Sequence, residues 1–570
     1  MPNQPHQPVT LIDELLAEQR SLTAVAKFAR AHEQHELPAQ ARHYRDLIPL
    51  SKPQAGQQYA FEVELDKCSG CKACVTACHS LNGLEEEETW RGVGLLHGGT
   101  YLQPIQQTVT TACHHCVDPE CLNGCPVLAY EKDPVTGIVK HLDDQCIGCQ
   151  YCVLKCPYDV PKYSQRLGIV RKCDMCSSRL ASGEAPACVQ ACPNEAIKIT
   201  LVETASVSES YRSKAAGEQV RKWESEQNRQ SHSPTFSPAH FLPGSPAPTI
   251  TLPTTRYISA KPLHASLRPA DAHELKPQCA HTPLGIMLVL SQLSVGTFTT
   301  ERILSLTSGE SIVTLRPALT LTALIIALVA LASSTMHLGR PLGAWRAFLG
   351  WRKSWLSREL IVFGLFAKLA MLYTASIWFP QFASPTIQSS LGWATVFTGL
   401  LGVFCSAMIY HDTHRDFWHL RWSGPKFLGT TALLGVTTTL LIASAASASN
   451  PFLPTLAAFG VLFGMLKLAS ELPIFRALEV EDYSPLHKTA LMLTGQFALL
   501  HRCRMALGIV GGVALPALLA LQLTRAAATP WLLIAGSAVI VALCLVGELI
   551  ERRLFFVAVQ PIQMPGGVAA

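Results

Sequence analysis

The fold of this chain is decided by the stretch Cys146-Ile-Gly-Cys149-Gln-Tyr-Cys152-Val-Leu-Lys-Cys156-Pro157. Three more groups of four cysteines surround it, so that sixteen of the twenty cysteines lie between residues 68 and 192. The first group repeats the spacing but has His79 in place of the proline, the second widens one gap, and the fourth contains a longer loop. These three groups are Cys68, Cys71, Cys74 and Cys78; Cys113, Cys116, Cys121 and Cys125; and Cys173, Cys176, Cys188 and Cys192.

The spacing predicts iron–sulfur clusters. Three thiolates at close intervals can bind three irons of one 4Fe–4S cube, whereas the fourth, which follows after three residues, binds the neighbouring cluster. Two groups should therefore share the binding of two clusters, so that four groups predict four clusters. Disulfides suit a small secreted scaffold, and no secretory signal opens the sequence. Structural zinc usually uses two separated Cys-x2-Cys knuckles, which these repeated triples do not match.

The composition divides the chain into two parts. The first 200 residues are rich in cysteine and charge, whereas the sequence from about residue 283 onward is strongly apolar. The mean hydropathy of +0.23 is high for a soluble protein and indicates that part of the chain lies in a lipid bilayer. The net charge of +5 is modest and gives no indication of nucleic-acid binding.

We expect four regions. Residues 1–58 form an N-terminal helical extension, because the pattern over residues 10–31 is helical. Residues 59–202 form an α+β ferredoxin-like domain with four clusters and short strands near 59–66, 136–142 and 196–202. Residues 203–280 are rich in Ser and Pro and predict a disordered linker. Residues 281–570 form an all-α polytopic membrane domain.

Eight apolar segments in this last region are long enough to span a bilayer. They cover residues 283–300, 317–336, 360–379, 391–410, 427–448, 452–469, 505–523 and 531–550. With eight spans, both ends of the membrane domain lie on one face, whose loops should carry fourteen bases against three on the other face. The positive-inside rule then predicts a multi-pass protein of the inner membrane with its cluster domain in the cytoplasm. The fourteen bases are Arg340, Arg346, Arg352, Lys353, Arg358, Arg415, Arg421, Lys426, Arg476, Lys488, Arg502, Arg504, Arg552 and Arg553.

A domain with four clusters that is joined to eight membrane spans suggests an electron-transfer chain that reacts with a quinone in the lipid. Haem b would need pairs of histidines inside the helices, but the histidines of this half lie at segment ends or in loops, which predicts no haem. His337 ends the second span and Glu359 opens the third, where they can accept the protons that quinol releases. Both could equally be interfacial residues that anchor helix ends. Lys368, Lys467 and Glu548 fall within or near apolar spans and are further candidates.

Two sets of motifs resemble the dimethyl sulfoxide reductase family of membrane molybdoenzymes. Residues 59–200 resemble the iron–sulfur subunit, through residues 146–158, Arg171-Lys-Cys-Asp-Met-Cys176 and Pro186-Ala-Cys-Val-Gln-Ala-Cys-Pro193. Residues 281–570 are similar to the membrane anchor subunit, through Met336-His-Leu-Gly-Arg-Pro341, Leu356-Ser-Arg-Glu-Leu360 and the segments 547–556 and 564–567. The chain thus resembles the two subunits fused, although the N-terminal helix, the linker and the fusion itself are not standard.

The resemblance implies a nested pairing of the groups, first with fourth and second with third. It also implies that the anchor oxidises menaquinol without haem, with His337 and Glu359 at the site, and that Cys149 makes all four clusters four-iron. The partner would be a separate molybdopterin-containing catalytic subunit. The implied ligand sets are Cys68, Cys71, Cys74 and Cys192; Cys78, Cys173, Cys176 and Cys188; Cys113, Cys116, Cys121 and Cys156; and Cys125, Cys146, Cys149 and Cys152.

We therefore expect an electron-transfer and anchor subunit that passes electrons from menaquinol to this partner in anaerobic respiration. The order of the clusters does not set the direction of flow. A subunit that carries electrons from a formate-, sulfur- or hydrogen-oxidising partner into the quinone pool is the alternative. A membrane protein with purely structural clusters is a third interpretation, which four paired groups disfavour, since one cluster would suffice for structure.

Overall fold

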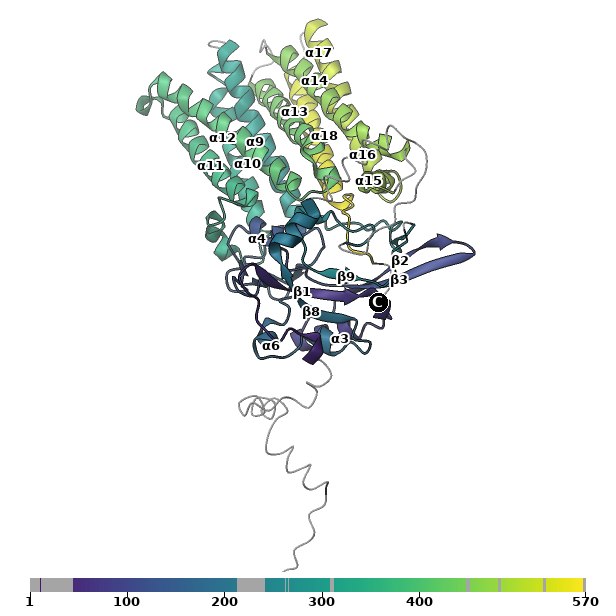
Figure 1. The fold of residues 1–570 in the computed structure, drawn as a ribbon. Helices are drawn as coiled ribbons and strands as arrows, with labels where there is room; N and C mark the ends of the chain where they lie inside the picture. The colour runs from purple at the N-terminus through teal and green to yellow at the C-terminus, as the bar shows by residue number, and fades with distance from the viewer. Residues whose placement is uncertain are drawn as a thin grey trace, which may run out of the picture.

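The computed structural model describes residues 11, 45–212, 241–261, 263–264, 266–307, 312–446, 452–479, 483–525 and 529–566. A domain of short strands and short helices lies below a bundle of long helices (Figure 1). The predicted fold class, an α+β ferredoxin-like domain followed by an all-α membrane domain, is confirmed. The helix predicted over residues 10–31 lies outside the described residues, apart from Leu11.

The α+β domain contains four small sheets. Their strand orders are β8-β1-β9, β10-β2-β3, β4-β5 and β6-β7. The predicted strands 59–66, 136–142 and 196–202 correspond to β1, β5 and β8, and Phe61 of β1 pairs with Ile199 of β8. The strands are β1 (Gln57–Glu64), β2 (Gly92–Thr100), β3 (Gln103–Thr111), β4 (Tyr130–Lys132), β5 (Val139–His141), β6 (Lys162–Ser164), β7 (Ile169–Arg171), β8 (Ile197–Glu203), β9 (Arg256–Ile258) and β10 (Arg268–Pro269).

Short helices connect the strands and hold the cysteine groups between them. Each has only one to three turns. The α-helices are α3 (Ala73–Asn82), α4 (Glu120–Gly124), α5 (Tyr151–Lys155), α6 (Ser177–Ala181) and α7 (Ala187–Gln190), and the 3-10 turns are η2 (Arg45–Leu47), η3 (Leu65–Lys67) and η4 (Pro248–Ile250).

The prediction of a disordered linker over residues 203–280 is wrong for its second half. Strand β9 pairs in parallel with β1, and β10 pairs with β2, so residues 241–280 contribute to the cluster domain. Leu242, Tyr257 and Leu267 are buried in one core with residues of β1 and β2. The many Pro and Thr residues concealed this, because two- and three-residue strands at a sheet edge need little apolar sequence.

The second half contains eight helices that are long and apolar enough to cross a membrane, among the residues described. The seventh span is interrupted by the π-helical segment η10, where Gly511 and Gly512 are buried. The elements are α9 (Thr282–Thr307), α10 (Arg316–Thr335), α11 (Trp355–Trp378), α12 (Pro385–His411), α13 (Leu420–Ala446), α14 (Leu453–Glu471), α16 (Ala498–Ile509), η10 (Val510–Ala514), α17 (Leu515–Arg525) and α18 (Pro530–Val557). Between them lie η6 (Pro341–Phe348), η7 (Pro380–Phe382), η8 (Asp416–Trp418), η9 (Leu472–Glu479) and α15 (Pro485–Thr494).

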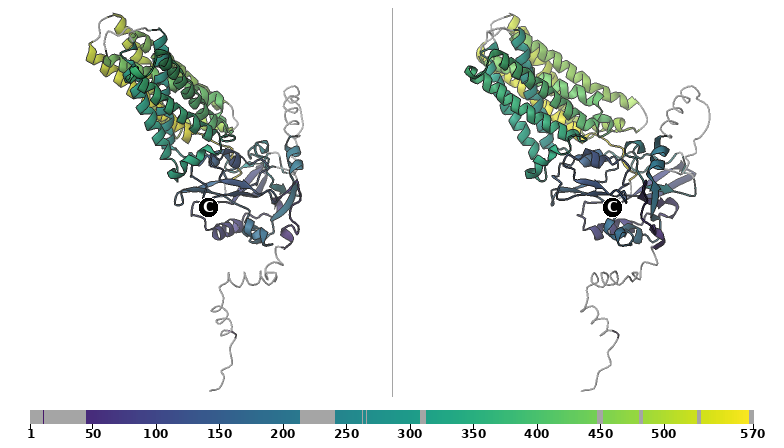
Figure 2. Two further views of the ribbon diagram at one scale, coloured as in Figure 1. Left: turned by 90° about the vertical axis from the view of Figure 1, so that its left-hand side faces the viewer. Right: turned by 60° about the vertical axis from the view of Figure 1, so that its left-hand side comes forward.

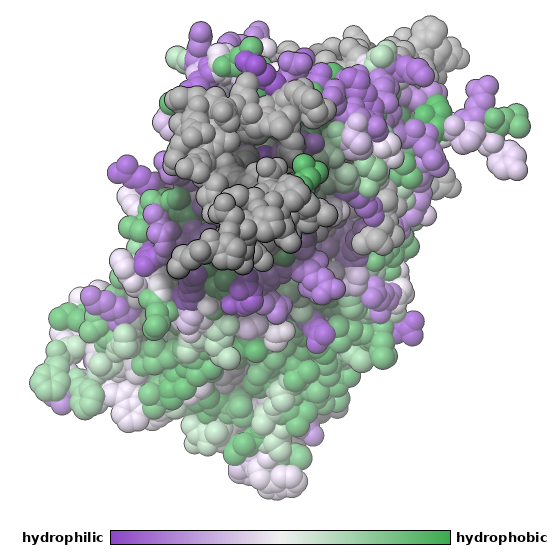
Figure 3. Space-filling model, turned by 90° about the horizontal axis from the view of Figure 1, so that it is seen from below, coloured by the Kyte–Doolittle hydropathy of each residue, from purple (hydrophilic) through white to green (hydrophobic). Residues whose placement is uncertain are grey.

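The helices form two groups of four. Helices α9 to α12 stand beside the group of α13, α14, α16–α17 and α18, and α9 packs on α13 where the groups meet (Figures 1 and 2). Figure 3 shows hydrophobic residues gathered over the helices and hydrophilic residues over the cluster domain. This division is the one that a bilayer requires.

The orientation argument needs one correction. Lys426, Arg504 and Arg552 were expected in loops, but they are buried inside α13, α16 and α18. The sequence did not reveal this because these helices extend beyond their most apolar windows. Of the true loop bases, Arg340 and Arg346 donate hydrogen bonds to the carbonyls of Asp143 and Asp144 in the cluster domain. These two arginines therefore also link the membrane domain to the cluster domain.

Candidate electron-transfer site

The cysteines of different groups approach one another in the folded domain. Cys149 and Cys152 of the third group both interact electrostatically with Cys125 of the second group. Conversely, Cys156 interacts with Cys116 and Cys121. The last cysteine of each group therefore lies with the first three of its partner group, as the nested pairing implies for these two groups.

The first and fourth groups exchange their last cysteines in the same way. Cys78 interacts with Cys188 and Cys176, and Cys74 interacts with Cys188 and Cys192. At least two members of each predicted ligand set therefore interact, and the full sets remain a prediction. We name each by its exchanged cysteine: the Cys125, Cys156, Cys78 and Cys192 quartets.

The quartets follow one another across the domain. Tyr130 interacts with both Cys125 and Cys121 and links the Cys125 and Cys156 quartets. Cys173 interacts with Cys113 and Cys78, which places the Cys78 quartet next. The Cys192 quartet is the outermost, since Cys71 is exposed while Cys125 is buried. The quartets are thus arranged in series, and Cys71, the exposed member of the four groups, belongs to the last of them.

The backbone turns in the first and third cysteine groups share one conformation. Gly148 and Gly70 have φ of 68° and 74°, and the residue after the next cysteine is also left-handed, at Gln150 and Lys72. At Gly148 a side chain has no room, because an added Cβ would overlap the carbonyl oxygen of Gly168. A left-handed conformation costs little only for glycine, so the turn at Gly148 requires glycine for two separate reasons.

Backbone N–H groups point at the sulfur atoms. The N–H of Gly148 donates to the Sγ of Cys146 at 3.4 Å, that of Ala129 to Cys125 at 3.2 Å, and that of Ala196 to Cys192 at 3.3 Å. Such hydrogen bonds stabilise thiolates and set the reduction potential of a cluster.

The chemistry of the thiols also fits iron–sulfur clusters. Burial and the neighbouring Cys188 raise the pKa of Cys78 to about 12, so its thiolate needs a cationic partner at neutral pH. Within the described chain, no group of three or more Cys, His, Asp or Glu side chains converges closely enough to hold a single metal ion.

Two buried cations lie among the quartets. Arg91 interacts with Cys188 and Cys74, and its guanidinium stacks on Phe61 at 4.7 Å. The Nζ of Lys172 lies 3.7 Å from the Sγ of Cys113. Both charges offset the negative charge that several thiolates concentrate in a small volume.

The Cys125 quartet lies against the membrane half. The N–H of Gly350 donates to the carbonyl of Pro126 at 2.8 Å, and the N–H of Arg340 donates to that of Ile147 at 3.0 Å. Gly339 packs on Gly168 so closely that neither has room for a side chain. The loop after α10 is therefore fixed against the third cysteine group.

This contact brings His337 and Glu359 to one cysteine loop. The His337 ring hydrogen-bonds the backbone of Cys149, and burial lowers the pKa of this histidine. Glu359 is buried in α11, accepts a hydrogen bond from Ser406 of α12 and interacts electrostatically with Tyr151. Two groups that can accept protons therefore lie at the quartet nearest the membrane.

Two further residues of this region, His281 and Tyr151, were not predicted. The ring centroid of His281 lies 5.0 Å from that of His337, and burial lowers the pKa of His281 to about 4. The hydroxyl of Tyr151 donates to Asp412 at 3.2 Å. Tyr151 stands between two ligating cysteines in the sequence, which is the only signal that could have drawn attention to it.

The three charged candidates in the spans have different environments. Lys368 is exposed on α11 and lies away from the site. Lys467 and Glu548 are buried and form an ion pair of 3.4 Å, in the other group of helices.

Comparison with known proteins agrees with this geometry. Residues 106–201 match the family model described as 4Fe-4S dicluster domain, and residues 278–557 match that of the DMSO reductase anchor subunit (DmsC). The B subunit of the anaerobic dimethyl sulfoxide reductase of Haemophilus influenzae is 36% identical over 156 residues, which are 26% of this chain and 76% of the relative. The chain belongs to the dimethyl sulfoxide reductase family of iron–sulfur and anchor subunits.

Other proteins that match the cysteine-rich part of the chain have different names. The thiosulfate reductase electron transfer subunit PhsB of Salmonella typhi is 34% identical over 153 residues, 26% of this chain and 79% of the relative. The hydrogenase-2 operon protein HybA of Escherichia coli O157:H7 is 38% identical over 156 residues, 23% of this chain and 48% of the relative. The protein is therefore a multi-pass membrane protein in which an iron–sulfur electron-transfer subunit is continuous with its anchor.

Proposed function

We propose that this protein oxidises menaquinol beside His337 and Glu359 and passes the electrons through four 4Fe–4S clusters to a separate molybdopterin-containing catalytic subunit. The observation that supports the proposal is that His337 hydrogen-bonds the backbone of Cys149 and Glu359 interacts electrostatically with Tyr151, in the same loop of the membrane-proximal quartet. Electrons that leave a quinol at this place have the shortest route into the cysteine-rich domain.

The residues of the site match the chemistry of quinol oxidation. A quinol gives up two protons and two electrons, and a 4Fe–4S cluster accepts one electron at a time. Glu359 and His337 can hydrogen-bond the two quinol hydroxyls and accept their protons. Ser406 keeps the Glu359 side chain oriented, and the Cys149 backbone does the same for His337.

The catalytic partner would bind at the outer end of the domain. The Cys192 quartet lies there, and Cys71 is exposed at its surface. A second redox centre that approached this surface would be nearer to the Cys192 quartet than to any other. The basic loops of this face, under the positive-inside rule, support a location of the domain and the partner on the cytoplasmic side of the inner membrane.

Electron flow in the reverse direction is the second candidate. It is favoured by the 38% identity with a protein that is named for a hydrogenase operon. In that case a catalytic partner would reduce the Cys192 quartet, and quinone would be reduced beside Glu359.

Co-purification with its natural partner tests both candidates. The complex is isolated anaerobically, its molybdenum is measured, and the dithionite-reduced clusters are mixed with dimethyl sulfoxide, thiosulfate or a naphthoquinone. We expect molybdenum in the complex and rapid cluster oxidation by an S-oxide or related acceptor. Rapid oxidation by the naphthoquinone alone, together with cluster reduction by hydrogen or formate, would support the reverse direction instead.

A further inference from the structure

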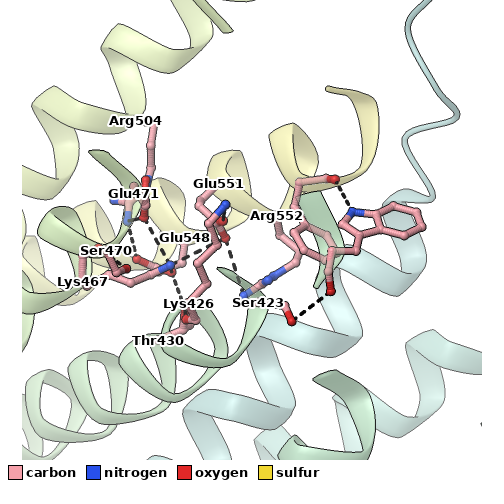
Figure 4. Close-up of polar contacts among 12 residues, drawn as sticks. Ser423, Lys426, Thr430, Lys467, Ser470, Glu471, Arg504, Glu548, Glu551 and Arg552 are labelled. Atoms are coloured by element: carbon pink, nitrogen blue, oxygen red, sulfur yellow. Dashed lines mark hydrogen bonds and ion pairs between the residues drawn. The ribbon is translucent and has the colours of Figure 1, made fainter. Parts of the chain in front are cut away.

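Seven charged side chains are buried together in the second group of helices (Figure 4). They come from four different helices, and each exposes at most 7% of its side chain. We call them the buried ion network. Its members are Lys426 of α13, Lys467 and Glu471 of α14, Arg504 of α16, and Glu548, Glu551 and Arg552 of α18.

One side of the network is tightly paired. Arg504 donates from Nη2 to Glu471 and to Glu548, each at 2.8 Å. Glu548 also accepts from the Thr430 hydroxyl at 2.5 Å, and the Nζ of Lys467 lies 3.2 Å from Glu471. These groups therefore pair their charges closely, as buried charges must.

The other side is loosely paired. The carboxylate of Glu551 faces Lys426, Arg552 and Lys467 at 3.6, 3.6 and 3.8 Å, and neither of its oxygens has a hydrogen-bond partner in the described structure. Polar contacts of this length leave room for an intervening water molecule or for a small rearrangement. The Glu551 carboxylate is therefore stabilised by the neighbouring cations, while both of its oxygens can still accept hydrogen bonds.

The network also has one positive charge too many. Four cations face three carboxylates, and an unbalanced charge is expensive in a membrane interior. Arginine does not release its proton in proteins, and Lys467 is near three carboxylates. Lys426 has one ion pair among the described residues, with Glu551, and otherwise faces the ring of Phe417 at 4.2 Å. Lys426 is thus the group that can lose a proton most easily and make the network neutral.

The network lies close to the proposed quinol site. Ser406, which hydrogen-bonds Glu359, is one helical turn before Tyr410 on the same face of α12. Tyr410 contacts the rings of Phe427 and Phe555 at 6.0 and 5.1 Å. The guanidinium of Arg552 lies over the same two rings, at 4.2 and 5.4 Å.

Tyr410 is therefore the polar group between the two sites. It interacts electrostatically both with Glu359 and with Arg552. Beyond the network, Glu471 is the last residue of α14, and the partly buried His501 of α16 interacts with it at the face of the cluster domain. Electrostatic interactions thus connect Glu359, Tyr410 and Arg552, and beyond the network they connect Glu471 and His501.

We propose that the buried ion network is a proton-exchange site, in which Lys426 accepts a proton that quinol oxidation delivers to Glu359 and releases it at the cluster-domain face. The proposal rests on the quinol oxidation proposed above. Each quinol loses two O–H bonds; its two electrons leave toward the Cys125 quartet and its two protons go to acceptors at the site. One proton then moves from Glu359 by way of Tyr410, forms an N–H bond at Lys426 and leaves past Glu471 and His501.

The charged groups that face Lys426 set its proton affinity. These are Glu551 and Arg552 on α18, Lys467 and Glu471 on α14, and His501 on α16. The carboxylates favour the protonated form and the other cations disfavour it, so the amine is able to exist in both states. A purely structural ion cluster gains nothing from a surplus cation, because well-packed apolar residues would replace it at no loss of stability.

The test measures cluster reduction in the purified full-length complex. Anaerobic protein is mixed with a reduced short-chain naphthoquinol in H2O and in D2O, and bleaching of the cluster absorbance is followed. Lys426→Met removes the charge, and Lys426→Arg keeps the charge but cannot release a proton. Lys368→Met, an exposed lysine of another span, is the matched control. Iron content and thermal unfolding identify any variant that fails to fold.

We expect both Lys426 variants to reduce their clusters at least about tenfold more slowly, with unchanged KM for the quinol and a larger solvent isotope effect. Dithionite should reduce their clusters at the normal rate, and Lys368→Met should behave as the wild type. Wild-type rate and isotope effect in Lys426→Arg would overturn the proposal, since the charge alone would then be sufficient. If quinol fails to reduce the clusters of the wild-type complex itself, the proposed function fails instead.

Discussion

The Nζ of Lys155 lies 2.8 Å from the Oδ2 of Asp412 and joins the third cysteine group to the end of α12. Lys155 is buried, and it also forms an ion pair with Glu120 in the loop of the second group. It further donates to the carbonyl of Asp412 at 2.9 Å. One lysine therefore connects the membrane-proximal quartet with the helix that holds Ser406.

Replacement of Asp412 should loosen this connection. Asp412→Ala leaves the Lys155 ammonium buried with one fewer acceptor, which should cost about 1–3 kcal/mol of stability. We expect a lower melting temperature of the detergent-solubilised protein and slower cluster reduction by quinol. Asp416→Ala, at an exposed position nearby, is the control. Equal effects of the two substitutions would show that the ion pair has no special role.

The nested pairing predicts which cysteines share a cluster. Cys71→Ser and Cys192→Ser should remove the same EPR signal, although the two residues belong to groups more than a hundred residues apart in the sequence. Cys176→Ser should remove a different signal, because it belongs to the Cys78 quartet. The exposed Cys279 lies outside all groups, so Cys279→Ser should leave every signal unchanged.

EPR spectra of the reduced variants decide this prediction. A pairing of neighbouring groups, first with second, would make Cys71→Ser and Cys125→Ser equivalent instead. Such a result would contradict the arrangement of the four quartets.

His281 should make the protein sensitive to acid. Burial lowers its pKa to about 4, below the ordinary value of 6.5, so the unfolded chain binds a proton that the folded protein does not. Stability is therefore unaffected above pH 6.5 and falls as the pH decreases toward 4, by at most about 3 kcal/mol. His281→Leu should remove this part of the acid sensitivity. Melting temperatures of both proteins between pH 7 and pH 4 measure it, and parallel curves would refute it.

The sequence predicted the parts of the fold that depend on regular spacing. The cysteine groups and the eight apolar segments follow simple periods, so the cluster domain and the helices could both be located. The β2–β3 hairpin was missed because four residues of β2 are glycines, including Gly98 and Gly99, which obscure the alternation of a strand. Strand β9 was missed because three residues at a sheet edge leave no pattern.

The site was predictable only one residue at a time. His337 and Glu359 were chosen by type and position at helix ends, but their interactions with the Cys149–Tyr151 loop depend on how the two domains dock. The buried ion network depends on packing in the same way. In the sequence, Lys426 and Arg552 look like ordinary loop bases. They are buried only because four helices pack around them in the folded protein.

The most direct test of the central claim is the reduction of the clusters by quinol in three matched proteins. Wild type, His337→Arg and Glu359→Gln are mixed anaerobically with a naphthoquinol, and cluster EPR signals are recorded after rapid freezing. We predict full reduction in the wild type and at least about a hundredfold slower reduction in both variants, with normal reduction by dithionite. Equal rates of quinol-dependent reduction in all three proteins would contradict the account.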